Sequence, residues 1–370
     1  MLTIGLMSGT SADGVDAALC EFDDSGAMKI RSTIFLPYDT SLNERIHSLC
    51  NTADPDENEV SAVDRELVDC FTHAVMDLLQ KSGTRAYEVS VMGSHGQTIR
   101  HCPECSPPYS RQIGDPGLLA QRTGIATVGD LRSADLLAGG QGAPLAPGFH
   151  NAVFRSSQAN RVILNIGGIA NITRLPADLS QPVTGFDTGP GNTLVDTWIR
   201  QALNQPYDRN GQWARTGSQI PGLLQHLMDE PYFKKAPPKS TGRELFSNSW
   251  LRIKLENFTE NKAEDIAATL VAFTVNTIID SLERYAGDTE EIYVCGGGAH
   301  NQYLLELLKT GLSGRHLATT AELGIDPDWV EAAAFAWLAR QTLLGLPGNL
   351  PEVTGASRPV VLGTLHASAG

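Results

Sequence analysis

The chain carries one strand pattern twice: a short apolar strand, a turn rich in glycine, and a second strand. The first copy is GLMSGTSADGVDAAL at residues 5–19, and the second is RVILNIGGIANITRL at residues 161–175. Further strand and helix patterns follow each copy, which is typical of an α/β domain. The repeat therefore predicts two α/β domains of related topology, with a ligand-binding cleft between the copies.

The domain boundary is predicted at LAGGQGAPLAP, residues 137–147, because a stretch so rich in glycine and proline breaks the strand and helix patterns. A length of 370 residues also favours two domains. We expect an N-terminal domain at 1–145, a second domain at 146–326 and a C-terminal segment at 346–370. An apolar helix near 327–345 is expected to complete the first domain, with Asp326 as its N-cap and Pro327 at its first position.

The net charge is −14, which argues against non-specific binding to nucleic acid or to an anionic membrane surface. We find no apolar run of the ~18 residues that a spanning helix needs and no signal peptide, so residence in the cytoplasm is expected. The sequence leaves open whether the chain forms a homodimer. Cys102 and Cys105 form a single CxxC pair, whereas a structural zinc site usually needs two pairs. Reduced thiols in a solvent-side loop are therefore expected there.

Several catalytic motifs are missing from the sequence. It contains no GxxxxGK[ST] phosphate loop, no GxSxG elbow and no HExxH motif. The segment closest to GxGxxG is GPGNTL at 189–194, which lacks the final glycine. A P-loop protein and a dinucleotide-binding fingerprint are therefore both disfavoured.

Four glycine turns remain, at residues 9–16, 165–171, 187–192 and 296–298, and each follows a predicted strand. Backbone N–H groups in such turns can bind phosphate oxygens without a lysine. Asp13, Asp16 and Asp187 could hold Mg²⁺ directly or through water. The alternative is that these are ordinary tight turns, in which aspartate is common.

Three further residues are candidates, each with a structural alternative. Asp187 ends an apolar strand and could act as a base, or it could cap the helix that starts near Asn192. His95 directly follows a buried strand, where a histidine is more often structural than catalytic. Arg132 could bind a substrate carboxylate through two parallel hydrogen bonds, or it could be an ordinary surface arginine.

Eight motifs together resemble those of the anhydro-N-acetylmuramic acid kinases, and they run in order from residue 5 to about residue 356. They are GLMSGTSADGVD, GSHGQTIRH, LRSADLLAGGQGAPLAP, LNIGGIANIT, GFDTGPGNTLVDTWI, PKSTGRELF, VCGGGAHN and PGNLPEVTGA. Two departures are Ala12, where the family commonly has leucine, and Thr188, where some members have cysteine. Neither changes a carboxylate or a glycine.

The resemblance implies the fold of the acetate and sugar kinase, heat-shock-70 and actin superfamily, with two ribonuclease-H-like domains around a central ATP cleft. It also implies a cytoplasmic enzyme that uses ATP and Mg²⁺ in peptidoglycan recycling. Such an enzyme opens the ring of 1,6-anhydro-N-acetylmuramic acid and phosphorylates O6. The alternatives are another sugar kinase or a phosphatase of this superfamily, or a non-catalytic ATP-gated binding module.

Site residues are carried over from the same resemblance. Asp187 would be the base that activates water, and His95, Arg132 and Glu331 would bind the sugar. Arg132 would face the lactyl carboxylate. The residues implied at the ATP site are Gly9, Thr10, Ser11, Ala12, Asp13, Gly14, Val15, Asp16, Gly167, Gly168, Gly189, Gly191, Asn192, Gly296, Gly297 and Gly298.

Overall fold

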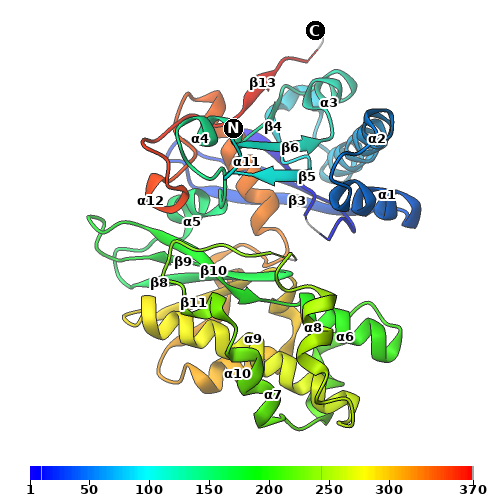
Figure 1. Ribbon diagram of the computed structural model, residues 1–370. Helices are drawn as coiled ribbons and strands as arrows, with labels where there is room; N and C mark the ends of the chain where they lie inside the picture. The colour runs from blue at the N-terminus through cyan, green and yellow to red at the C-terminus, as the bar shows by residue number, and fades with distance from the viewer. Residues whose placement is uncertain (10, 243, 369–370) are drawn as a thin grey trace. The chain divides into compact units, whose positions relative to one another are not determined.

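The computed structural model describes residues 1–9, 11–242 and 244–368, and the chain divides into two compact units. Unit 1 comprises Met1–Phe154 and Trp329–Gly370, and unit 2 comprises Arg155–Asp328. In Figure 1 the blue, cyan and red parts of the chain therefore belong to unit 1, whereas green and yellow dominate unit 2. The C-terminal segment returns to the unit in which the chain began.

The central sheet of unit 1 has the strand order β13-β7-β4-β1-β2-β3. The strands β1, β2 and β3 form an antiparallel meander, β4 and β7 run parallel to β1, and β13 is antiparallel to β7. Their bounds are β1 Leu2–Met7, β2 Gly14–Phe22, β3 Met28–Pro37, β4 Val89–Ser94, β7 Thr127–Gly129 and β13 Thr364–His366.

The sheet of unit 2 repeats this topology, with the order β10-β9-β8-β11-β12. Its first three strands are an antiparallel meander and its last two run parallel to β8. The bounds are β8 Arg161–Ile166, β9 Ile169–Leu175, β10 Thr184–Pro190, β11 Glu291–Cys295 and β12 His316–Thr319. Each unit thus has the 3-2-1-4-5 order of a ribonuclease-H-like domain, and the prediction of a duplicated α/β topology is confirmed.

Helices cover both faces of the sheet in unit 1. The bounds are α1 Thr40–Asn51, α2 Glu57–Ser82, α3 Pro116–Thr123, α4 Ser133–Leu137, α5 Ala146–Phe154, α11 Val330–Leu343 and α12 Pro351–Thr354, and a separate hairpin is formed by β5 Gln97–Cys102 and β6 Tyr109–Ile113. The helix α2 begins after the N-cap Asp56 and ends at Gly83 in the left-handed conformation. Its apolar positions, spaced at three and four residues, are buried as predicted.

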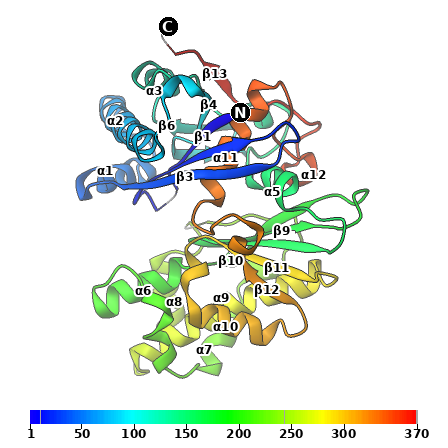
Figure 2. The ribbon, with the colours of Figure 1, turned by 180° about the vertical axis from the view of Figure 1, so that it is seen from behind.

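The helix α11 packs directly against the backbone of β1 and β4, as Figure 2 shows from behind. Ile4 and Leu6 belong to the core cluster that contains the apolar face of α2. Successive side chains of a strand point to opposite faces, so Gly5 faces the other side. A Cβ atom on Gly5 would collide with the carbonyl oxygen of Ala332, and one on Gly93 with that of Phe335. Glycine at these two positions allows α11 to lie against the sheet.

The predicted start of this helix is wrong. The helix α11 begins at Val330, after Trp329 as its N-cap residue. The carboxylate of Asp326 accepts a hydrogen bond from the Asp328 N–H in a preceding turn. The carbonyl of Pro327 accepts one from the Gly296 N–H, so these residues belong to unit 2.

Unit 2 is built around the helix α9, Ala263–Tyr285. Around it lie α6 Thr193–Leu203, α7 Pro221–Met228, α8 Asn248–Leu255 and α10 Gln302–Gly311. The expectation that no segment is long and apolar enough to span a membrane is wrong for α9, since this helix passes that test by length and composition. However, 78% of its apolar window is buried inside the structure, where it packs in the core of unit 2.

The expectation of reduced thiols at the CxxC pair is also contradicted. Cys102 ends β5, and its sulfur is bonded to that of Cys105 in the turn that leads to β6. Because only two residues separate the cysteines, this turn brings their Cα atoms to 5.4 Å, within the range that a disulfide spans.

Candidate active site

The turn between β1 and β2 is held in place by side-chain hydrogen bonds. The Ser8 hydroxyl is buried, donates a hydrogen bond to Gln97 Oε1 at 2.6 Å and accepts one from the Tyr38 hydroxyl at 2.8 Å. The Gln97 amide also donates to the carbonyl of Gly9 at 3.2 Å. The Ser8 hydroxyl therefore serves to fix the turn.

The predicted ATP-binding stretch at 9–16 divides into exposed and buried residues. Ser11 and Asp13 are exposed, and the Ser11 hydroxyl donates to the Asp13 carboxylate at 2.7 Å. Ala12 is buried with φ +50°, and its carbonyl accepts a hydrogen bond from Asn43. Gly14 and Val15 are buried at the start of β2, whereas Gly9 and Asp16 are half-buried. Thr10 lies outside the described residues.

The described part of the chain holds no group of three or more His, Cys, Asp or Glu side chains placed to bind a metal. Mg²⁺ in kinase sites commonly keeps several waters and takes one or two carboxylates plus the phosphates of the nucleotide. The exposed carboxylate of Asp13 and the half-buried carboxylate of Asp16 fit that requirement.

In unit 2 the three predicted glycine turns lie together at one end of the sheet. The N–H groups of Gly191 and Asn192 donate to the carbonyls of Gly168 and Gly167, both at 2.9 Å. A Cβ atom on Gly191 would collide with the Gly167 carbonyl, which explains glycine at this position. Because these N–H groups are already bonded, Gly191 and Asn192 shape the turn instead of presenting free donors.

The third turn, Gly296–Gly298, joins this group at the end of β11. Gly296 has φ +76°, and a Cβ atom there would collide with Oδ1 of Asn165 at the end of β8. A Cβ atom on Gly298 would collide with the side chain of Ile166. Ligands of open α/β sheets bind beyond the carboxyl ends of parallel strands, which is where β8 and β11 end here.

Asp187 lies in β10 at a β-bulge. The pairing register with β9 shifts between Asp187 and Gly189, so Thr188 is the extra residue, and its hydroxyl donates to the Ala170 carbonyl at 3.1 Å. Gly189 has φ +153°, and a Cβ atom there would meet the Phe233 ring at 2.8 Å. Bulges of this kind redirect a side chain next to a site.

The carboxyl of Asp187 is bonded to a loop, residues 238–245, in which no site residue was predicted. The N–H of Thr241 donates to Asp187 Oδ2 at 3.0 Å, and the Tyr232 hydroxyl donates to the Asp187 carbonyl at 2.6 Å. Desolvation and the nearby Glu244 raise the pKa of Asp187 to about 6, although the Thr241 hydrogen bond and the Lys239 ammonium lower it. Thr241, Glu244 and Lys239 belong to the family motif PKSTGRELF, and that motif was the available signal.

His95 and Arg132 are in direct contact in unit 1. The Arg132 guanidinium donates from Nη2 to His95 Nε2 at 2.8 Å and from Nη1 to the Gly142 carbonyl at 2.7 Å. His95 Nδ1 lies 2.9 Å from the carbonyls of Ser8 and Gly96, so it carries the proton. Burial and the Arg132 charge lower the pKa of His95 to about 3, which keeps the imidazole neutral.

Arg132 remains charged at neutral pH, although burial lowers its pKa to about 10. A guanidinium has five N–H donors, and the two described bonds occupy only two of them. Glu331, in the first turn of α11, lies close enough for each charge to favour the other. The Glu331 side chain is exposed, although desolvation by the surrounding protein raises the pKa of its carboxyl. The three predicted sugar-binding residues are therefore brought together.

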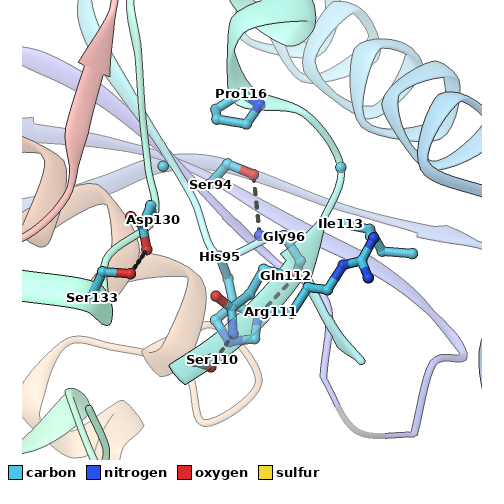
Figure 3. Close-up of a pocket in the computed structure, with 12 residues that line it drawn as sticks. Ser94, His95, Gly96, Ser110, Arg111, Gln112, Ile113, Pro116, Asp130 and Ser133 are labelled. Atoms are coloured by element: carbon cyan, nitrogen blue, oxygen red, sulfur yellow. Dashed lines mark hydrogen bonds between the residues drawn. The ribbon is translucent and has the colours of Figure 1, made fainter. Parts of the chain in front are cut away.

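A cavity of about 230 Å³ adjoins His95 (Figure 3). Its wall carries polar side chains of Ser94, Gln112, Asp130 and Ser133, with Ser133 bonded to Asp130 at 2.6 Å. Ligand pockets usually measure about 300–1,000 Å³, so this cavity suits a part of a ligand. Hydroxyl, amide and carboxylate groups can form hydrogen bonds with a polar ligand, and Arg111 also lines the cavity.

The duplicated topology, with glycine turns at strand ends, defines a two-domain α/β protein of the class that includes actin-like ATPases and sugar kinases. The family model for anhydro-N-acetylmuramic acid kinase matches residues 1–368. The anhydro-N-acetylmuramic acid kinases of Nitrosospira multiformis and Nitrosomonas europaea are 47% and 46% identical to this chain, over 98% and 99% of both sequences. The chain belongs to the anhydro-N-acetylmuramic acid kinase family, so it is a kinase that uses ATP and an amino-sugar substrate.

Solved structures with bound nucleotide analogues are more distant. An activator of 2-hydroxyisocaproyl-CoA dehydratase from Clostridium difficile, with bound ADPNP, is 14% identical with a TM-score of 0.45, over 92% of this chain and 94% of that one. A ROK family glucokinase from Streptomyces griseus, in complex with glucose and AMPPNP, is 13% identical with a TM-score of 0.42, over 92% and 100%. These similarities are too low to support a residue role.

Proposed function

We propose that this enzyme adds water to C1 of 1,6-anhydro-N-acetylmuramic acid and transfers the γ-phosphoryl group of ATP to O6. The products are N-acetylmuramic acid 6-phosphate and ADP. In the substrate O6 is bonded to C1, so position 6 has no free hydroxyl to accept the phosphoryl group. Ring opening and phosphorylation therefore have to be coupled.

The base in this proposal is Asp187. Water loses a proton to the Asp187 carboxylate as its oxygen bonds to C1 and the C1–O6 bond breaks. O6 then bonds to the γ-phosphorus, and the bond from that phosphorus to the bridging oxygen breaks, so that ADP leaves. The observation that carries the assignment is the placement of the carboxyl at a β-bulge, where the Thr241 N–H binds Oδ2, and the raised pKa of about 6 agrees with it. A general base works best when its pKa lies near the operating pH, because a stronger base that is still deprotonated accepts a proton more readily.

The sugar is positioned by Arg132 in this proposal. The guanidinium has N–H donors left for the lactyl carboxylate, which it can bind through two parallel hydrogen bonds. His95 is neutral and accepts from Arg132, so it orients the guanidinium and takes no part in proton transfer near neutral pH. The negative charge of Glu331 would stabilise the positive charge of Arg132.

ATP would be bound by the exposed tip of the β1–β2 turn and by the glycine turns at the ends of β8, β10 and β11. Mg²⁺, held by Asp13 or Asp16, would neutralise phosphate charge when bound. The Ser11 hydroxyl, which donates to Asp13 in this structure, would turn to donate to a phosphate oxygen. We also infer a cytoplasmic location and a role in peptidoglycan recycling, without nucleic-acid or membrane partners.

The test is Asp187→Asn, which retains the shape of the side chain and removes the base. Sugar-dependent ADP release should fall by about 10²–10⁴-fold, the usual contribution of general base catalysis, while the Kd for ATP stays within about twofold. Asp178→Asn, in an exposed loop of the same unit, is the matched control and should keep full activity. Unchanged turnover in the Asp187→Asn variant would remove Asp187 from the mechanism.

A further inference from the structure

The motif PGNLPEVTGA at residues 347–356 lies in unit 1 but has no place in the proposed chemistry. Two of its side chains reach a buried carboxylate. Asn349 Nδ2 and the Thr354 hydroxyl each donate to Asp135 Oδ1 at 2.7 Å. Asp135, in α4, has no exposed surface, and Asn349 and Thr354 are 5% and 1% exposed. A carboxylate so far from solvent depends on these donors.

The other oxygen of the same carboxylate holds the loop that binds Arg132. Asp135 Oδ2 accepts a hydrogen bond from the Gly142 N–H at 2.8 Å, and the Gly142 carbonyl accepts from Arg132 Nη1 at 2.7 Å. Gly142 has φ +66°, so this turn suits glycine. The N–H of Gln141 also donates to the Thr354 carbonyl at 2.8 Å.

We propose that Asp135, Asn349 and Thr354 are positioning residues for the sugar, which act by fixing Gly142 and, through it, the Arg132 guanidinium. The inference rests on the proposed role of Arg132 in binding the substrate carboxylate. A continuous series of hydrogen bonds leads from the C-terminal motif through Asp135 and Gly142 to Arg132. Arg132 then continues it to His95. Binding of a carboxylate by a planar guanidinium depends on orientation, so a loosened Gly142 turn should weaken it.

The experiment compares two sugars across four variants of the full chain. Affinities are measured by calorimetry for 1,6-anhydro-N-acetylmuramic acid and for 1,6-anhydro-N-acetylglucosamine, which lacks the lactyl carboxylate. Asp135→Asn and Thr354→Val should weaken binding of the first sugar by about 10–100-fold, as misplacement of a binding group does, and should leave the second nearly unchanged. Arg132→Lys measures how much affinity for the first sugar is lost with the bidentate contact itself.

Ser357→Ala is the matched control. The Ser357 hydroxyl donates to the Ala138 carbonyl at 2.8 Å, so this variant loosens the same segment without touching Asp135 or Gly142. It should bind both sugars normally. The inference is overturned if Arg132→Lys lowers the affinity for the lactyl sugar whereas Asp135→Asn and Thr354→Val do not. It is also overturned if these two variants weaken both sugars equally, as a general loss of structure would.

A structural readout keeps the inference separate from the proposed function. If the wild-type chain does not bind the lactyl sugar, the proposed function fails, and a crystal structure of Thr354→Val or Asp135→Asn still decides the inference. We expect the contact of Arg132 Nη2 with His95 Nε2, 2.8 Å in the present structure, to be lost or lengthened. An unchanged contact would contradict the positioning role.

Discussion

At the scale of single residues, the environment of Asp187 combines two opposing effects on its carboxyl group. Desolvation and Glu244 favour the protonated form, whereas the Thr241 N–H and Lys239 favour the carboxylate. The net effect raises the pKa from 3.8 to about 6. Asp187 is therefore mostly ionised at neutral pH and remains a stronger base than an ordinary aspartate.

The pH dependence of turnover follows from this value. With ATP saturating, kcat/KM for the anhydro sugar should rise tenfold per pH unit below about 6 and level off above it, because only the carboxylate accepts a proton from water. Initial rates of ADP release between pH 5 and 8 provide the measurement. A profile that is flat from pH 5 to 7 would show that no group with this pKa acts as the base.

The raised pKa of Asp187 also affects the stability of the folded chain. The pKa of Asp187 is higher in the folded chain than its ordinary value of 3.8, so the free energy of unfolding falls as the pH rises through about 6. The protonated form makes its full contribution only below pH 3.8. Asparagine carries no charge, so it avoids the free-energy cost of ionising the desolvated carboxyl. Asp187→Asn should therefore be more stable than wild type by about 1–3 kcal/mol at pH 7.5.

Urea unfolding of wild type and Asp187→Asn at pH 7.5 and pH 4.5 measures this difference. The gain should be largest at pH 7.5 and clearly smaller at pH 4.5, where most of the carboxyl of the folded wild type is protonated. A gain of equal size at both pH values would mean that desolvation of the charge is not its cause.

At the scale of elements, close packing of α11 on the sheet depends on glycine. A Cβ atom on Gly93 would meet the carbonyl oxygen of Phe335, a backbone atom that cannot turn away. Gly93→Ala should therefore displace α11 and lower the free energy of unfolding by about 1–3 kcal/mol, the usual cost of overpacking. It should also raise KM for the sugar, because His95 follows β4 and Glu331 lies in α11.

Gly222→Ala in α7 is a suitable control, since the nearest atom to an added Cβ, in the Phe258 ring, is 3.8 Å away. Alanine is the better helix former, so this variant should be as stable as wild type or slightly more stable. Thermal unfolding of both variants followed by circular dichroism compares them. Equal melting temperatures for Gly93→Ala and wild type would contradict the close packing of α11.

Elements with a strong local pattern could be predicted from the sequence. The hairpins β1–β2 and β8–β9 lie where glycine turns interrupt apolar strands. The start of α11 could not be predicted, because the contact of Pro327 with Gly296 is a tertiary one. The CxxC pair was misjudged because the sequence does not show that β5 and β6 form a hairpin around it.

At the scale of the whole molecule, two copies of one topology carry different parts of the proposed chemistry. Unit 1 contains His95, Arg132 and Glu331, whereas unit 2 contains Asp187 and three glycine turns. The assignment of each residue to a unit could be predicted from the motifs. The hydrogen bonds that hold these side chains could not be predicted, because their partners are far apart in the sequence. Thr241 lies 54 residues from Asp187, and Thr354 lies 219 residues from Asp135.

The central claim is that Asp187 directs water to C1 while O6 receives the phosphoryl group. Mass spectrometry of the product made in ¹⁸O-water tests it most directly, with short reaction times and with unlabelled product in the same water as a control for exchange at C1. We predict one ¹⁸O atom at the C1 hydroxyl, none in the phosphoryl group, and about 10²–10⁴-fold less labelled product from Asp187→Asn in the same time. Label in the phosphoryl group, or none at C1, would contradict the account.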